Sequence, residues 1–352
     1  MKILFIDPSC IIAYNNYSLT QGAIGGTEST VIRVANALTE YNNKVYVTQH
    51  LRSQDELDVS GVSYISFVYA KKIVPDIVII LRDYRRLKEF ALVYPRAKIF
   101  FWMHDLPRLK MRSFRKDFIK LNCLIICVSK FHADATAKIL HGTWYDKIYD
   151  FIFYRQKKSI NIKFIYNLID GNLQIDDTLV EKNKIIFFSS PNKGLQETIL
   201  HFNAIKKNFP GLKLYIANPG YIDLFNCKQL NKELLKSDDI VVLGPLKHSD
   251  IIKHVRSAFC VFYPQAYKAE TFGLIYLEAN SVGTPVLAHD FGAAREVLSN
   301  SDQLINAKKE ANIIGKLKKW YTHGRPKVFR QEKFFKDIIM QNWLAILMDH
   351  NK

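Results

Sequence analysis

The sequence has few cysteines and no long apolar run, and both absences exclude classes of protein. Its five cysteines are odd in number and form no C-x-x-C pair, which argues against a disulfide framework and is typical of a reducing cytoplasm. Apolar runs such as residues 77–81 have the length of a strand, far below the roughly 20 residues of a membrane-spanning helix. The first residues, "MKILFIDP", are interrupted by Asp7 and Pro8 too early for a secretory signal and predict a buried strand.

Several nucleotide and metal motifs are also missing. The chain has neither the G-K-S/T of a P-loop nor G-x-G-x-x-G, and its second predicted strand ends in "VYVTQH", without the acid that binds the ribose of NAD. An NAD enzyme is therefore not expected. The histidines form no H-x-x-x-H or His/Cys cluster and no D-x-D sequence occurs, so we predict neither a metal site nor a cofactor.

What the sequence does contain is enough apolar material for two cores and a large excess of positive charge. It has 352 residues, of which 48% are hydrophobic and 13% aromatic. Lys plus Arg number 50 against 33 Asp plus Glu, a net charge of +17. Such an excess is typical of proteins that bind nucleic acid, anionic lipid or phosphorylated substrates. A composition rich in Lys, Asn and Ile also produces it through solvated surface lysines alone, and both interpretations stay open.

Strand-like and helix-like segments alternate along the chain. Predicted strands in the first half are residues 2–6, 44–48, 77–81, 98–103 and 123–128, with helices such as residues 28–41 and 130–140 between them. Predicted strands in the second half are residues 163–166, 184–189, 213–217, 240–243, 260–263 and 285–288. This alternation predicts an α/β protein with two Rossmann-like domains, each a parallel sheet covered by helices on both faces.

The polar stretch "NLIDGNLQIDDT", residues 167–178, separates the two series. We therefore expect an N-terminal domain at residues 1–168 and a C-terminal domain at residues 169–330. Residues 331–347 show apolar residues at helical spacing, and we expect the segment 331–352 to return and pack on the first domain. A ligand-binding cleft is expected between the domains, because ligands bind at the carboxyl ends of parallel strands.

Three candidate site segments follow predicted strands. Gly25 and Gly26 precede a helix for which Thr27 is the expected N-cap, and glycine lets backbone N–H groups approach a phosphate. His104 and Asp105 follow the fourth strand, where a neutral histidine can donate or accept hydrogen bonds; a helix-capping aspartate beside a structural histidine explains the pair equally well. Lys193, in "FFSSPNKGL", is placed to neutralise a diphosphate, although surface lysines are common in this chain.

The most informative segment is "AETFGLIYLE", residues 269–278. Glu270 precedes a predicted helix start at Phe272 and Gly273, and Glu278 lies about two helical turns inside. The backbone N–H groups and the positive dipole of the helix start attract an anion. Carboxylates accept strong hydrogen bonds from hydroxyls. Two acids beside a phosphate site therefore match a nucleotide sugar, with the sugar at one end and ribose at the other.

These features together resemble the retaining glycosyltransferases of family 4, which have the two-domain GT-B fold. Glu270 and Glu278 stand in the family's pattern of two glutamates separated by seven residues, with Phe272, Gly273 and Leu274 between them. The similarity extends to "GTPVLAHDFGAAREVL", "GGTE", "CVSKFHAD" and "NLID", and so covers nearly the whole chain. Two departures are the missing arginine before Lys193 and Leu168 in place of a glycine.

The resemblance implies a role for each matching residue. It implies that Glu270 holds hydroxyls of the donor sugar and that Glu278 holds the ribose hydroxyls. The backbone of Phe272, Gly273 and Leu274 would bind the phosphates, which the first loop would approach at Gly25 and Gly26. Lys193 would offset charge on the leaving diphosphate, and His104 would contact the donor sugar from the opposite domain. The base is expected near residues 218–221 and 243–246.

The expected activity is retaining, metal-independent transfer of a hexose from a nucleotide diphosphate sugar, with UDP-glucose as the first candidate donor and GDP-mannose as the second. The expected acceptor is a glycolipid, lipopolysaccharide or polysaccharide. The expected location is the cytoplasm, including an anionic inner membrane face. A second interpretation makes modified DNA the acceptor, which the charge of +17 suits although nucleic acid is the less favoured partner. A third is a non-catalytic protein that binds nucleotide sugar or nucleic acid.

Overall fold

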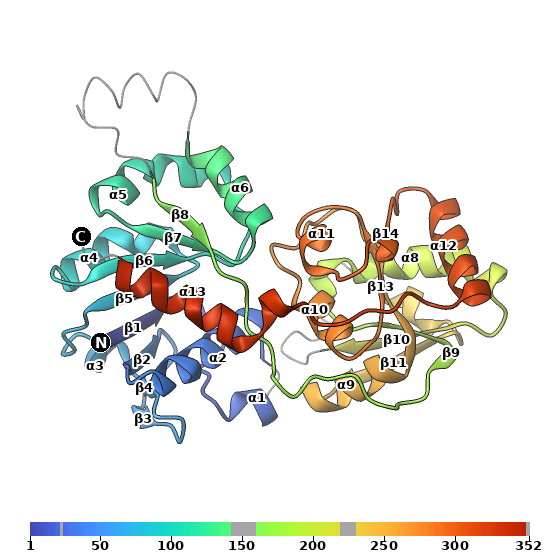
Figure 1. The fold of residues 1–352 in the computed structure, drawn as a ribbon, viewed down its shortest axis with the longest axis horizontal. Helices are drawn as coiled ribbons and strands as arrows, with labels where there is room; N and C mark the ends of the chain where they lie inside the picture. Colours follow the sequence, from blue (N-terminus) through green and yellow to red (C-terminus); the bar gives the residue numbers. More distant parts are fainter. Residues whose placement is uncertain (22–23, 142–159, 219–229, 350–352) are drawn as a thin grey trace. The chain divides into compact units, whose positions relative to one another are not determined.

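In a computed structural model, residues 1–21, 24–141, 160–218 and 230–349 are described. The chain divides into two compact units (Figure 1). The first unit comprises Met1–Asn16, Thr30–Leu168 and Lys336–Lys352, and the second comprises Tyr17–Ser29 and Ile169–Phe335. Residues 219–221 of the expected base site, and Cys227, lie outside the described residues.

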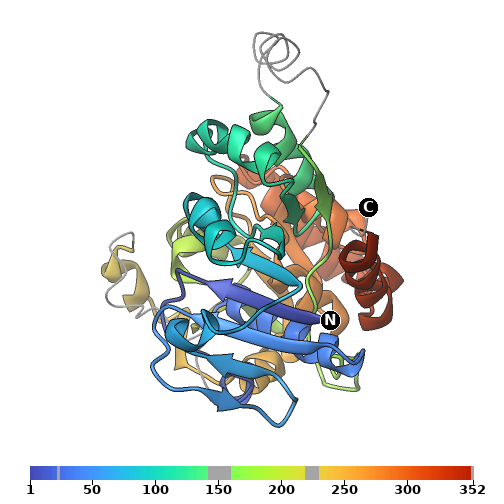
Figure 2. The same cartoon turned by 90° about the vertical axis from the view of Figure 1, so that its left-hand side faces the viewer.

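The first unit is built on an eight-stranded sheet (Figure 2). Its strands are β1 (Lys2–Asp7), β2 (Lys44–Gln49), β3 (Glu56–Leu57), β4 (Ser63–Ile65), β5 (Ile77–Leu81), β6 (Lys98–Trp102), β7 (Leu124–Cys127) and β8 (Ile162–Phe164). Their order is β3-β4-β2-β1-β5-β6-β7-β8, and every pair is parallel except β3 with β4. All five residues of β5 are buried, as expected of a parallel strand covered on both faces.

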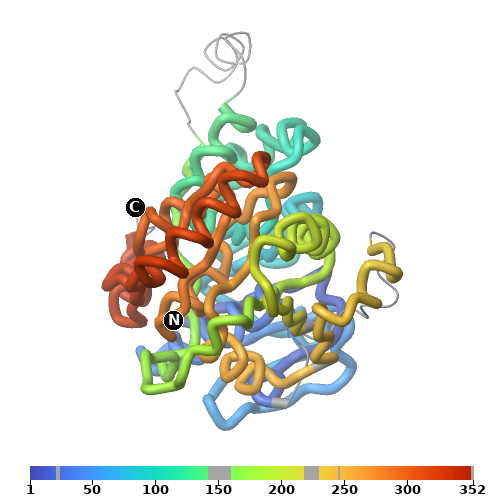
Figure 3. The backbone as a smooth tube through the Cα atoms, turned by 90° about the vertical axis from the view of Figure 1, so that its right-hand side faces the viewer, coloured from blue at the N-terminus to red at the C-terminus, as the bar shows by residue number. Residues whose placement is uncertain are grey.

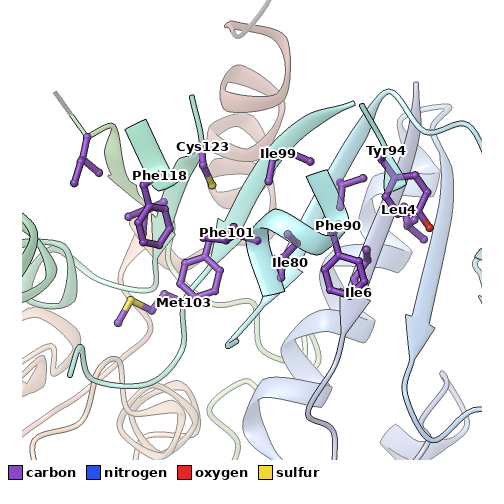
Figure 4. Packing of buried hydrophobic residues seen from close by; sticks show 14 of the residues in the cluster. Leu4, Ile6, Ile80, Phe90, Tyr94, Ile99, Phe101, Met103, Phe118 and Cys123 are labelled. Atoms are coloured by element: carbon purple, nitrogen blue, oxygen red, sulfur yellow. The ribbon is translucent and has the colours of Figure 1, made fainter. Parts of the chain in front are cut away.

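One face of this sheet packs against the helices that connect its strands. The helices and turns of the unit include α3 (Phe67–Ala70), η1 (Tyr84–Arg86), α4 (Leu87–Val93), η2 (Leu109–Phe114), α5 (Arg115–Lys120) and α6 (Lys130–Leu140). Alternate strand residues such as Ile6, Ile80 and Phe101 meet Phe90 of α4 and Phe118 of α5 in one apolar cluster (Figure 4). The two-residue period of the strands directs the intervening residues to the opposite face.

The C-terminal helix belongs to the first unit. α13 (Lys336–Asp349) buries Trp343 completely, and its ring stands perpendicular to that of Trp102 in β6, with ring centroids 4.8 Å apart. The expectation that the tail packs on the N-terminal domain is confirmed. The helix begins later than predicted, because residues 332–334 form a short 3₁₀ turn, η8 (Glu332–Phe334), and Phe335 is extended with ψ 147°.

The second unit contains a six-stranded sheet in which every pair is parallel. Figure 3 shows the course of the backbone from the side of this unit. The strands are β9 (Glu181–Phe187), β10 (Lys213–Asn218), β11 (Ile240–Pro245), β12 (Ala258–Tyr263), β13 (Val286–His289) and β14 (Leu304–Ile305), in the order β11-β10-β9-β12-β13-β14. The predicted pair of α/β domains with parallel sheets is thus confirmed. The central strands β9 and β12 end beside each other, and the loops that follow them carry Lys193 and Glu270.

The helices of the second unit that the structure describes lie before, between and after these strands in the sequence. They are α1 (Ser18–Gln21), α8 (Leu195–Ile205), α9 (His248–Ser257), α10 (Leu274–Ser281), α11 (Ala294–Val297) and α12 (Glu310–His323), with the turns η3 (Pro191–Lys193), η4 (Lys206–Asn208), η6 (Lys232–Lys236) and η7 (Ser301–Gln303). α8 packs on α12 and α9 packs on α10. In the described part of the chain, no helix is both long and apolar enough to cross a bilayer.

The first loop differs from its prediction in one detail. α2 (Gly26–Glu40) begins one residue before the expected N-cap Thr27. The amide of Ser29 donates to the carbonyl of Gly25 at 3.0 Å, which places Gly25 at the cap and Thr27 inside the first turn. The difference follows from the absence of a side chain at both glycines, which lets the helix start early.

Candidate active site

A strand, a loop and a helix start form the central feature of the second unit. β12 ends at Tyr263, the loop carries Glu270, and α10 begins at Leu274 after the N-cap Gly273. Gly273 has φ 84°, and a Cβ there would lie 2.5 Å from Cδ2 of Tyr276. Only glycine fits this position without strain, so Gly273 determines where the helix starts and where its free N–H groups point.

Glu270 is almost fully buried, and both of its carboxylate oxygens accept hydrogen bonds. Tyr263 donates its hydroxyl to Oε1 at 2.8 Å, and Lys193 donates from Nζ to Oε2 at 2.8 Å. The side chain of Lys193 is 40% exposed against 7% for Glu270. The structure therefore brings together two residues that the sequence singled out, and it leaves the lysine able to move into solvent.

Sequence reasoning missed Tyr263. Burial, followed by the nearby Glu270 carboxylate, raises the pKa of Tyr263 well above its ordinary value, so this phenol stays a neutral donor. Its hydrogen bond thereby fixes Oε1 of Glu270 from the end of β12. In the sequence Tyr263 ends the apolar run "CVFY" and is indistinguishable from a core aromatic. The only available signal was its place at the carboxyl end of a central strand.

Gly292 supports Glu270 from a second loop. The amide of Ala293 donates to the carbonyl of Glu270 at 3.1 Å. Gly292 has φ 62°, and a Cβ on it would lie 2.9 Å from that same carbonyl oxygen. The segment "DFGAA" therefore acts as a backbone clamp that holds the loop of Glu270, and a side chain at Gly292 is incompatible with it.

We predict that Gly292→Ala destabilises the second unit by roughly 1–3 kcal/mol and lowers any activity that depends on Glu270, because of strain at positive φ and the clash with the carbonyl. Chemical denaturation measures the first effect. Gly315→Ala is the matched control: Gly315 lies within α12 with nothing within 4 Å of its Cβ position, and alanine there should stabilise by about 0.5–1 kcal/mol. Equal effects of the two substitutions would contradict the clamp.

Glu278 lies inside α10 and is also buried. His248, the first residue of α9, places its Nε2 3.0 Å from Oε1 of Glu278. Sequence reasoning missed this histidine as well, since it lies 30 residues from Glu278 and belongs to no recognisable motif. Each of the two acids of the predicted motif thus has a polar partner from another element.

The residues between the two acids contribute through their backbone. Phe272 is buried, and its ring packs edge-on against Phe334 with centroids 5.8 Å apart, so its side chain belongs to the core. The amide of Tyr276 donates to the carbonyl of Gly273 at 2.9 Å, and the N–H groups before it, at the start of the helix, have no acceptor within the helix. This geometry suits an anion at the helix start.

Gly25 and Gly26 lie close to two side chains. A Cβ on Gly25 would lie 2.2 Å from Oε2 of Glu28, and a Cβ on Gly26 would lie 2.8 Å from Cδ1 of Leu274, a residue of the same unit. A side chain at either position would require the end of the Glu28 or Leu274 side chain to shift. The Glu28 carboxylate lies over Gly25, at the positive end of α2 where the sequence suggested a phosphate.

His104 lies in the first unit, immediately after β6. It is buried with its ring 4.6 Å from that of Trp102. Burial, then the charges of Arg82 and His132, holds the pKa of His104 well below its usual range, so the imidazole is neutral at pH 7. Neighbouring His132, whose pKa burial lowers to about 4, lies 2.8 Å from the Asp105 carbonyl through Nε2.

Binding a metal ion and holding a reactive thiol each require a particular arrangement of side chains. They contain no group of three or more His, Cys, Asp or Glu side chains placed to hold a metal ion. Cys10, Cys123, Cys127 and Cys260 are buried free thiols. Burial raises the pKa of both Cys127 and Cys260 to about 12, so neither is a thiolate at neutral pH.

Part of this chain is similar to known glycosyltransferases. Residues 174–332 match the family model described as "Glycosyl transferases group 1". A glycogen synthase of Mycobacterium tuberculosis (strain H37Rv) is 29% identical over 109 residues, 31% of this chain and 25% of that protein. An alpha-monoglucosyldiacylglycerol synthase of Streptococcus pneumoniae (strain R6) is 29% identical over 115 residues, 32% of this chain and 24% of that protein. The matches thus span about a quarter of each curated relative.

A solved structure extends the similarity to the whole chain. The crystal structure of Anabaena Alr3699/HepE in complex with UDP-glucose superimposes with a TM-score of 0.64 at 18% identity, covering 99% of this chain and 95% of that one. At this identity the likeness shows the fold, which is GT-B as expected from the sequence. The family match is confined to residues 174–332, within the second unit.

Proposed function

We propose that this chain is a retaining glycosyltransferase of family 4 that moves a sugar from a nucleoside diphosphate donor to a glycan or glycolipid. The observation that carries the proposal is the buried Glu270 carboxylate, which Tyr263 and Lys193 both contact at 2.8 Å, beside the start of α10. This reaction requires three groups: a carboxylate that binds sugar hydroxyls, a helix start that binds phosphates, and a lysine that can move to offset the charge of the leaving diphosphate.

The geometry supports an order of events at Glu270. When a diphosphate binds at the start of α10, Lys193 exchanges its bond with Glu270 for one with the phosphates, because the diphosphate carries more negative charge. Tyr263 keeps Oε1 in place, and Oε2 becomes available to hydroxyls of the donor sugar. Donor binding and the freeing of Glu270 are thereby coupled through Lys193.

Transfer with retention then needs no additional base. The bond from the anomeric carbon to the phosphate oxygen breaks, and the acceptor hydroxyl forms its bond on the same face. The acceptor proton passes to the departing phosphate oxygen, whose charge Lys193 offsets. The site acts mainly by positioning and electrostatic stabilisation. His104 stays a proposed contact to the sugar, since a neutral imidazole both donates and accepts hydrogen bonds.

UDP-glucose is the donor we favour, followed by GDP-mannose. The solved relative binds UDP-glucose, and the two curated relatives are named for glycogen and for a glucosyl lipid. Those names also support a polysaccharide or glycolipid acceptor. The net charge of +17 suits a cytoplasmic enzyme that acts at an anionic membrane face.

The test incubates the protein with UDP-glucose or GDP-mannose labelled with ¹³C at the anomeric carbon, together with glycan and glycolipid acceptors. We expect one donor to raise the melting temperature. NMR should show an α-linked product, and transfer should persist in EDTA. A β-linked product would overturn retention, and loss of transfer in EDTA would overturn metal independence. If neither sugar nucleotide binds or reacts, the proposed function is wrong.

A further inference from the structure

The second acid of the motif has one polar partner that the proposed function leaves unassigned. Glu278 is buried on α10, and His248 Nε2 lies 3.0 Å from its Oε1. Across the described ranges, no other side chain or backbone group is hydrogen-bonded to the Glu278 carboxylate. His248 stands at the first position of α9, which packs on α10, so the contact joins two helices that are fixed relative to each other.

A single hydrogen bond of this kind orients a buried carboxylate and leaves its other acceptor positions available to a ligand. A neutral imidazole that carries its proton on Nε2 donates to Oε1. This hydrogen bond offsets part of the free-energy cost of burying the carboxylate charge. An ionised carboxylate has about four lone-pair positions, so three remain after this bond. Two of them suffice for a pair of neighbouring hydroxyls. The His248 side chain is 32% exposed, so the pair lies near the surface, where a ligand can reach it.

We propose that His248 is a positioning residue that holds Glu278 in the orientation needed to bind the 2′ and 3′ hydroxyls of the donor ribose, and so selects ribonucleotides over deoxyribonucleotides. This inference rests on the proposed function, in which Glu278 binds ribose. His248 acts through Glu278 and needs no contact with the ligand. Without His248, the Glu278 carboxylate samples other rotamers. Binding of the ribose hydroxyls must then order this side chain, which lowers the affinity.

The experiment measures binding of UDP and 2′-deoxyuridine diphosphate by calorimetry, with GDP and 2′-deoxyguanosine diphosphate in parallel. Wild type should prefer the ribonucleotide by about tenfold or more, the value of one good hydrogen bond to a charged group. His248→Ala should weaken ribonucleotide binding by about tenfold and change deoxyribonucleotide binding by less than about threefold. His248→Gln keeps a donor near the Nε2 position and should restore most of the preference.

Further variants separate positioning from folding. Glu278→Gln should lose the preference as His248→Ala does, and the double variant should lose little more, because the two residues act as a unit. His323→Ala, at an exposed histidine that ends α12, is the matched control and should bind both nucleotides like wild type. Should His248→Ala fail to fold, the comparison of His248→Gln with His248→Asn decides, since asparagine is too short to reach Oε1.

The outcomes distinguish this inference from the function on which it depends. If wild type prefers the ribonucleotide and His248→Ala or His248→Asn keeps that preference, His248 has only a structural role and the inference is wrong, while the proposed function stands. A uniform loss of affinity for both nucleotides would also show a purely structural role. If wild type binds neither uridine nor guanosine diphosphate, the proposed function itself fails and the inference fails with it.

Discussion

Replacing Glu270 with glutamine should lower sugar transfer by about 100-fold or more, with little change in the stability of the fold. Glutamine keeps the size of the side chain, and its Oε1 can still accept from Tyr263. Its second terminal atom becomes a donor, which points N–H groups at Lys193 and at the sugar hydroxyls. The charged acceptor on which the proposed mechanism depends is therefore lost.

Stability should change little, because Lys193 is 40% exposed and can be solvated when its partner loses charge. Initial rates of nucleoside diphosphate release and melting temperatures measure the two effects. Glu310→Gln, at an exposed acid that begins α12, is the matched control and should retain full activity. Turnover by Glu270→Gln within about threefold of wild type would refute the role of Glu270 and the coupling through Lys193.

The regular part of the fold could be predicted because its signals are local. The run of residues 77–81 forms the fully buried strand β5, and α6 spans the predicted helix at residues 130–140. β3 was missed for the opposite reason. It has two exposed residues, Glu56 and Leu57, and exists only through its antiparallel pairing with β4, which leaves no period in the sequence.

The candidate site could be predicted only where a motif carries it. Glu270 and Lys193 were both singled out, and the structure bonds them although they lie 77 residues apart; their roles in transfer stay predictions. Tyr263 and His248 were not found, because each acts through a partner that only the folded chain brings near. The clamp by Gly292 was missed for the same reason, since positive φ and closeness to the Glu270 carbonyl are properties of the assembled loops.

Removing the Trp343 side chain from the C-terminal helix, by Trp343→Ala, should strongly destabilise the first unit. Trp343 is completely buried and meets Trp102 edge to face at 4.8 Å, which is a favourable arrangement of aromatic rings. Its Nε1 has no hydrogen-bond partner among the described residues, so the loss on substitution is one of packing. We expect a cost of about 3–5 kcal/mol for the first unit, which corresponds to a fall in its melting temperature of roughly 6–20 °C.

Scanning calorimetry of the variant and of wild type measures this fall in melting temperature. Met348→Ala is the matched control, because Met348 lies on the same helix but is 56% exposed, and it should change stability by less than about 0.5 kcal/mol. A Trp343 variant as stable as the Met348 variant would mean that α13 adds nothing to the first core. A large difference would show that the sheet of the first unit depends on a segment distant in sequence for one of its covering layers, and that truncation before Lys336 removes a structural element of that unit.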